Sequence, residues 1–222
     1  MTKTASETYF ENLCNDLGVQ LTRIQETQSK APDYELIIDG QHVVVEVKEM
    51  TKNKEEQDSD RALRERGYGK VLSTTPGDRV RKKISESSPQ IKSRTKGKYP
   101  SLLALFDHGL VAGHLDPYCI RVAMYGLEQV HIAVPVDCSV SPYATGMGYG
   151  PKRKMTEEHN TSISAIGVMF ANEHKKIVLH IYHNKFAAIP LESRLFAKFG
   201  ICQSKLADEA ARRTAKWEEM LN

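Results

Sequence analysis

The chain has 222 residues, of which 40% are hydrophobic and 27% charged, with a formal net charge of +3 at pH 7. This composition suits one globular domain spanning residues 1–222, and it excludes a membrane span because no apolar run approaches the roughly 20 residues needed. The first residues, MTKTASETYF, lack the layout of a secretory signal, and the four cysteines form no Cys-x-x-Cys pair, which argues against structural zinc and favours a reducing cytoplasm.

The first predicted element is a helix over residues 6–17. Apolar residues recur there at helical spacing, Ser6 is a suitable N-cap, and Gly18 is a suitable stop. A strand is expected over 19–24, followed by a polar loop over 25–31. A helix and a strand therefore precede the strongest local signal in the chain.

That signal is a β-hairpin. Asp39-Gly40 separates two β-rich runs, and this dipeptide is typical of a two-residue hairpin turn. Opposed positions then sum to 79, so Asp33 faces Glu46, and strand alternation places Lys48 on the same face as Glu46. A three-residue turn would shift this register and misalign the two acids. The other face of the hairpin is apolar and comprises Tyr34, Leu36, Val43, Val45 and Val47.

The elements after the hairpin are predicted from periodicity and from helix start and stop signals. Residues 49–76 form a long polar excursion, partly helical over 56–66. A helix capped by Asp78 runs to about Lys92, although Pro89 threatens to end it early. The remaining expected elements are a buried strand at 101–106, a helix between Asp116-Pro117 and Gly126, a strand at 128–134, a Gly-rich loop at 139–161, a hairpin of 162–170 with 176–183, and a C-terminal helix at 204–221.

Positive charge is concentrated in one stretch of the chain. Residues 61–100 hold twelve Lys or Arg and three acids, a net charge of +9, so the rest of the chain sums to −6. Such a distribution favours a polyanion-binding face, while a solvated helix surface is the simpler alternative. The residues predicted to contact nucleic acid are Arg79, Arg81, Lys82 and Lys83 at the start of one helix and Lys152, Arg153 and Lys154 in the Gly-rich loop, where Tyr143 and Tyr149 are candidates for base stacking.

Two opposed carboxylates repel each other unless a cation neutralises them. Mg²⁺ suits this role because it prefers oxygen ligands and is commonly held by one or two carboxylates and a substrate phosphate. We therefore predict a Mg²⁺ (or Mn²⁺) site formed by Asp33, Glu46 and the Val47 carbonyl, with Lys48 holding the attacking water. The simpler alternative is an exposed strand with an ordinary salt bridge. Glu-x-Lys alone is a weak motif, and it recurs at residues 173–175.

The spacing Pro32-Asp33, twelve residues, Glu46-Val47-Lys48 resembles the signature of the PD-(D/E)XK nuclease superfamily. The resemblance implies an α/β fold of the restriction-endonuclease-like type, with a mixed central sheet and an α-β-β-β-α-β core over residues 6–107, an elaboration over 108–203 and the C-terminal helix. It also implies products with 5′-phosphate and 3′-hydroxyl ends. Residues 9–13 resemble the superfamily's first-helix pattern, in which a glutamate at the place of Glu11 supports the metal through water.

Several alternatives stay open within this resemblance. Glu7 is the alternative to Glu11 as the glutamate that supports the metal. Glu11 is equally well interpreted as a solvated helix residue. Gln90 matches a glutamine that related nucleases carry near the site, but Pro89 interrupts the match. His180 and His183 should point to opposite faces of a strand, so a shared metal is not expected. The segments MYGLE (124–128), NTSIS (160–164) and YHNKFAAIPL (182–191) resemble uncharacterised bacterial and phage proteins that carry such a core.

The sequence thus predicts a cytoplasmic, metal-dependent nuclease that cleaves nucleic acid, with DNA favoured over RNA and no membrane partner. A homodimer would allow both strands to be cut, although the sequence carries no dimerisation signal. A second hypothesis is a catalytically inactive nucleic-acid- or protein-binding module of the same fold. A third is a different fold in which the hairpin is a coincidence.

Overall fold

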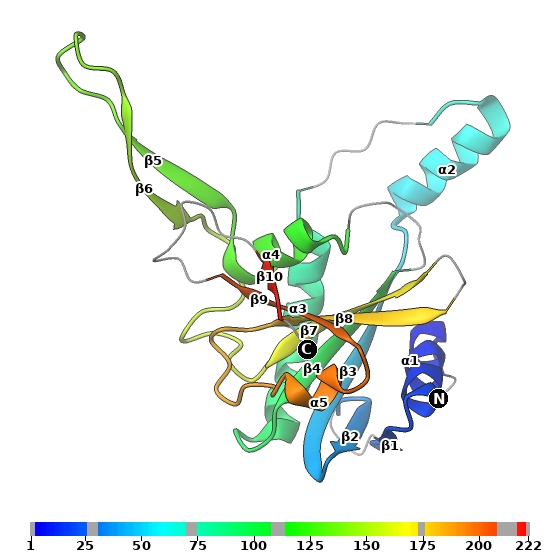
Figure 1. Ribbon diagram of the computed structural model, residues 1–222. Helices are drawn as coiled ribbons and strands as arrows, with labels where there is room; N and C mark the ends of the chain where they lie inside the picture. The colour runs from blue at the N-terminus through cyan, green and yellow to red at the C-terminus, as the bar shows by residue number, and fades with distance from the viewer. Residues whose placement is uncertain are drawn as a thin grey trace.

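The computed structural model describes residues 3–25, 31–69, 75–107, 114–172, 176–207 and 217–220. These residues form a mixed α/β structure with one large sheet, a separate two-stranded sheet and flanking helices (Figure 1). Within these ranges, no helix combines the length and apolar character that crossing a membrane requires.

The structure contains helices on both sides of the large sheet (Figure 1). The helices are α1 (Ala5–Asp16), α2 (Lys54–Arg66), α3 (Asp78–Thr95), α4 (Pro117–Tyr125) and α5 (Arg194–Ala197). The strands are β1 (Gln20–Arg23), β2 (Tyr34–Ile38), β3 (Gln41–Met50), β4 (Ser101–Asp107), β5 (Glu128–Ala133), β6 (Tyr143–Tyr149), β7 (Ala165–Ala171), β8 (Ile177–His183), β9 (Cys202–Leu206) and β10 (Trp217–Glu219).

The large sheet has eight strands in the order β1-β2-β3-β4-β7-β8-β9-β10. Its middle is parallel, because β4 pairs in the same direction with β3 and with β7, while β1-β2, β2-β3 and β7-β8 are antiparallel. Nearly all of β4 is buried, as expected for a parallel strand covered on both faces. The order of helix, three strands, helix and strand predicted for the first half of the chain is therefore present.

The predicted hairpin is confirmed in turn and register. Ile38 pairs with Gln41 and Tyr34 pairs with Val45, so opposed positions sum to 79. The turn residues Asp39 and Gly40 both have positive φ, +50° and +75°, as a type I′ turn requires. This turn matches the twist of the strands and fixes which face each side chain takes.

The two faces of the sheet are covered by different helices. The predicted apolar face of the hairpin packs against α1, where Phe10 and Leu13 contribute to the core. The other face packs against α3 and α4 through Val80, Ile84 and Ile120. Glu46 and Lys48 are on this second face, so α3 lies over the predicted active-site strand.

The caps of α1 and α3 differ from the prediction. Thr4, not Ser6, caps α1 through a capping box in which its hydroxyl accepts from the Glu7 N–H and the Glu7 carboxylate accepts from the Thr4 N–H. Gly77, not Asp78, is the N-cap of α3. Pro89 does not end α3, because it is exposed while apolar residues on both sides of it are anchored against the sheet.

Two predicted elements are wrong. Residues 143–149, expected in a loop, form β6 and pair with β5, since their glycines accept the extended conformation of a ribbon. The expected C-terminal helix is replaced by β9, which pairs with β8, and by β10, whose Trp217 packs near Tyr182. Residues 208–216 of that helix, residues 26–30 of the polar loop and the second Glu-x-Lys at 173–175 lie outside the described residues.

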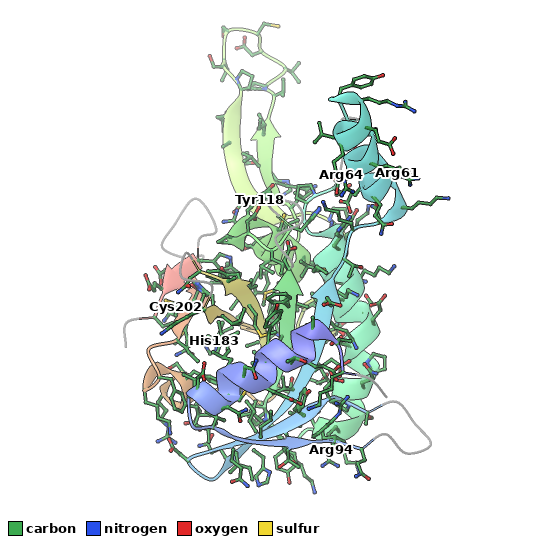
Figure 2. All side chains as sticks on the ribbon, turned by 90° about the vertical axis from the view of Figure 1, so that its right-hand side faces the viewer. Arg61, Arg64, Arg94, Tyr118, His183 and Cys202 are labelled. Carbon is green, nitrogen blue, oxygen red and sulfur yellow. The ribbon has the colours of Figure 1, made fainter. Side chains whose placement is uncertain are left out.

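Two elements project from the same side of the body. These are α2 and the ribbon formed by β5 and β6, which rise away from the large sheet in both views (Figures 1 and 2). Arg61 and Arg64 are on α2, away from the sheet (Figure 2). The positive charges of α2 are therefore separated from the body of the protein.

We expect Gly40→Ala to destabilise the protein by about 1–2 kcal/mol, because an L-residue pays that penalty in the left-handed region. Gly146→Ala is the matched control, since Gly146 does not have positive φ and an added Cβ meets no atom within 4 Å. Its stability should stay within about 0.5 kcal/mol of wild type. Urea denaturation measures both, and equal stability of the two variants would contradict the turn assignment.

Candidate active site

A pocket of about 480 Å³ opens where β3 emerges beside the start of α1. The hairpin brings Asp33, Val47 and Lys48 to it, α3 contributes Lys83, and β1 contributes Arg23. The complete lining is Thr4, Ser6, Glu7, Arg23, Ile24, Pro32, Asp33, Val47, Lys48, Glu49, Thr51 and Lys83.

Asp33 immediately precedes β2 and is fixed by the backbone of β3. Its Oδ2 accepts a hydrogen bond from the Val47 N–H at 2.7 Å. Burial raises the pKa of Asp33, opposed by this hydrogen bond and by the positive charge of Lys48. The side chain thus continues the β2-β3 ladder and holds a carboxylate at the pocket wall.

Glu46 is fully buried, with no exposed surface. Its Oε1 lies 2.5 Å from the Lys48 Nζ, yet neither carboxylate oxygen has a hydrogen-bond partner of acceptable geometry. Burial, and then the nearby charge of Asp33, raise the pKa of Glu46 to about 7. A buried carboxylate with such poor hydrogen bonding is costly, which is typical of a functional site.

Lys48 remains a cation at neutral pH. Burial favours its neutral form, but the close ion pair with Glu46 and the charge of Asp33 outweigh this, and the pKa of Lys48 is raised. About a quarter of its side chain is exposed, toward the pocket. Lys48 can therefore donate hydrogen bonds to a water or an anionic oxygen, but it is not a base at this pH.

The two candidate glutamates of α1 take different positions. Glu11 accepts hydrogen bonds from Lys3 and from the Tyr34 hydroxyl, at 2.7 and 2.8 Å, and does not line the pocket. Glu7 does line it, and its Oε1 pairs with Arg23 at 2.8 Å. The structure therefore brings Glu7 to the pocket that Asp33 and Lys48 line, whereas Glu11 is held by Lys3 and Tyr34 outside that lining.

The predicted basic residues of α3 divide into structural and accessible ones. Arg79 pairs with Glu56 and donates to the Thr51 carbonyl. Arg81 is buried and binds Asp78 and the Val122 carbonyl, so it joins α3 to α4. Arg81 is thus a structural cation, while Arg79 keeps 22% of its side chain exposed beside Glu56.

The accessible cations lie in the pocket and beside it. Lys83 lines the pocket with Lys48. The preceding residue, Lys82, lines a second hollow of about 360 Å³, which the three predicted loop cations also line. We name this hollow the basic groove; it is lined by Asp78, Arg81, Lys82, Ser85, Lys152, Arg153 and Lys154.

The site fits a hard divalent cation in its chemistry. Two carboxylates converge, and the buried oxygens of Glu46 lack good partners, which is the deficit that a cation would correct. Among the described residues, no three His, Cys, Asp or Glu side chains form a metal-binding group. A metal would therefore depend on Asp33, Glu46 and the Val47 carbonyl, with water or phosphate completing the shell, as Mg²⁺ allows.

Other predicted residues lie elsewhere. His180 and His183 bond to different partners, Ser204 and Gln203, and share no site. Gln90 has a buried Oε1 without a partner, on the face of α3 between Lys83 in the pocket and Arg94, which reaches Glu35 of β2 at 3.4 Å (Arg94 is labelled in Figure 2).

Arg23 is the pocket residue that the sequence analysis missed. It pairs with Tyr34 across β1 and β2, which places it next to Asp33. Only the register of β1 against β2 reveals this, and no turn signal in the sequence fixes that register. Comparison with models of protein families, with curated proteins and with solved structures found no match.

We expect Glu46→Gln to stabilise the metal-free protein at pH 8 by about 2 kcal/mol. Between pH 4.5 and 7 the folded protein binds a proton at Glu46 that the unfolded chain releases, so wild-type stability falls as pH rises through this window. Glu46→Gln has no carboxyl group at this position, so its stability does not fall through this pH window.

Urea denaturation in EDTA at pH 5 and pH 8 measures the effect, with Glu65→Gln on exposed α2 as the control. A stability difference between Glu46→Gln and wild type that is the same at both pH values would show that Glu46 is not a destabilised carboxylate.

Proposed function

We propose that this protein is a metal-dependent phosphodiesterase that cleaves nucleic acid, with DNA favoured, and that its fold is of the restriction-endonuclease-like type. The observation that carries the proposal is the fully buried carboxylate of Glu46, which contacts the Lys48 ammonium and lies close enough to Asp33 for the two acids to interact. A purely structural ion pair would not need a second carboxylate at the same place. The basic groove beside the pocket supplies the contact surface that a phosphate backbone requires.

Each residue of the site has a separate role in this proposal. Asp33 and Glu46, with the Val47 carbonyl, would hold Mg²⁺ or Mn²⁺, which when bound stabilises charge on the scissile phosphate and lowers the pKa of water. Lys48 donates to the attacking water and orients it toward phosphorus. Lys83 faces the same pocket and offsets the negative charge of the phosphate.

The Glu7–Arg23 pair supports this arrangement from the opposite wall. Glu7 raises and Arg23 lowers the pKa of Asp33, so the two charges act on it in opposite directions. Glu7 is tied to the α1 N-cap and Arg23 to the edge of β1. We therefore assign Glu7 rather than Glu11 the supporting position near the metal.

One observation favours a binding module without turnover. The Lys48 ammonium lies against Glu46, so the acid already has a partner charge in the protein itself. In such a module the cations would bind nucleic acid and no metal would be needed. The cleavage assay below separates the two functions.

We expect Asp33→Asn and Lys48→Ala each to reduce Mg²⁺-dependent cleavage of DNA at least a hundredfold, because each removes a group that acts on the reacting phosphate or water. Both variants should fold, since each leaves the apolar cores intact. Cleavage of circular and linear DNA and of RNA is followed on gels.

Asp16→Asn and Lys205→Ala, both at exposed positions, are the matched controls and should cleave as wild type does. If Asp33→Asn or Lys48→Ala keeps full activity, the site is wrong. If wild type binds nucleic acid but cuts none of these substrates with Mg²⁺ or Mn²⁺, the binding module is supported instead.

Lys152→Ala/Lys154→Ala should weaken DNA binding and flatten its salt dependence. Each lost phosphate contact lowers the slope of log K against log salt by about 0.7–0.9, so the double variant should lose roughly 1.4–1.8. Arg61→Ala/Arg64→Ala on the projecting α2 is the control and should keep the wild-type slope. Equal slopes for all three proteins would exclude the basic groove as the DNA path.

A further inference from the structure

A second hollow adjoins the basic groove and differs from it in chemistry. It measures about 240 Å³ and is walled by three aromatic rings, those of Tyr125, Tyr149 and Phe186. We name it the aromatic pocket; its other lining residues are Arg153, Met155, Glu157 and Lys185.

The rings come from three separate elements and are held at defined angles. Tyr125 is buried at the end of α4, and its hydroxyl donates to the His183 carbonyl at 3.1 Å. The Tyr149 and Phe186 rings lie 6.5 and 6.1 Å from the Tyr125 ring, inclined at 45° and 63°. Both are only partly buried and line the hollow together with the Lys185 side chain.

The aromatic pocket is continuous with the proposed path of a nucleic acid. Arg153 lines the aromatic pocket, the basic groove and a wider outer hollow of about 570 Å³. Adjacent residues of α3, Lys82 and Lys83, line the basic groove and the active-site pocket in turn. The basic groove thus shares Arg153 with the aromatic pocket, and it is linked to the active-site pocket through neighbouring residues of α3.

The Lys and Arg side chains that line the basic groove and the aromatic pocket favour an anionic ligand. Among the described residues, Lys152, Arg153 and Lys154 form no salt bridge, unlike Arg79 and Arg81 of α3, although Asp78 lines the basic groove and feels the charge of Lys152. Unpaired cations beside exposed ring faces are the combination by which proteins bind single strands, with cations on phosphates and rings on bases.

We propose that the aromatic pocket takes one unpaired nucleobase of the strand whose phosphates lie along the basic groove. This inference rests on the proposed function and specifies its substrate: single-stranded nucleic acid, or a duplex with an extruded nucleotide. A base that stays paired within a duplex is enclosed by its neighbours and cannot enter the pocket. Glu157 offers an acceptor to the amino group of an entering base.

A small organic cation is the other class of ligand that aromatic walls attract. Here the Lys185 ammonium already lies 5.6, 5.8 and 5.0 Å from the centroids of Tyr125, Tyr149 and Phe186. Two cations, Lys185 and Arg153, and one carboxylate, Glu157, line the pocket, so its balance of charge favours a base carrying a phosphate over a further cation. The charges therefore favour a nucleotide.

The test is binding of a fluorescein-labelled 12-nucleotide DNA strand, measured by anisotropy in EDTA so that no cleavage occurs. Phe186→Leu and Tyr149→Leu should each weaken binding of the single strand about tenfold, and leave binding of the matching duplex within twofold. Tyr149→Phe keeps the ring and Phe170→Leu removes an exposed ring on β7, so both should bind as wild type does. Thermal melting confirms that each variant is folded.

A fully abasic strand of the same length should bind equally to wild type and to the Leu variants. Unchanged affinity of both Leu variants for the single strand, equal losses on strand and duplex, or failure of wild type to bind the strand would each overturn the inference. These outcomes are independent of catalysis. If the protein binds the strand through the rings but cleaves no substrate, the inference about the aromatic pocket holds and the proposed function is wrong.

Discussion

Glu46 places an acidic group where water cannot reach it, between β3 and α3, and beside a second carboxylate. Desolvation and like-charge repulsion both oppose its ionisation, and one lysine offsets them only in part. The surrounding sheet must be rigid enough to hold this arrangement. The parallel pairing of β3 with buried β4, and the packing of α3 above both, supply that rigidity.

The geometry around Glu46 depends on a turn that lies at the far end of the hairpin. Asp39 and Gly40 set a register in which Asp33 reaches the Val47 N–H, and a slip of one residue would move Glu46 to the α1 face. The cations of α3 and of the loop at 152–154 then extend a positive surface from the pocket. In the proposed function, the hairpin supplies the chemistry and the adjoining hollows supply the substrate contacts.

The parts of this structure that the sequence predicts are those fixed by local signals. The Asp39-Gly40 turn and strand alternation were enough to bring Asp33 and Lys48 together, and the helix signals at Asp116 and Gly126 hold in α4. Non-local packing decided the rest. Pairing with β5 makes a strand of the Gly-rich segment at 143–149. Residues 202–206 form a strand because they pair with β8. Arg23 reaches the pocket only through the register of β1 against β2.

The central claim is that the carboxylates of Asp33 and Glu46 hold a divalent cation. Calorimetric titration of Mn²⁺ into the protein at pH 8, with and without a DNA strand, tests it most directly. The account predicts one Mn²⁺ site in wild type that is lost in Asp33→Asn and in Glu46→Gln, and kept in Glu11→Gln. Absence of Mn²⁺ binding by wild type under both conditions, or binding by Asp33→Asn equal to that of wild type, would contradict it.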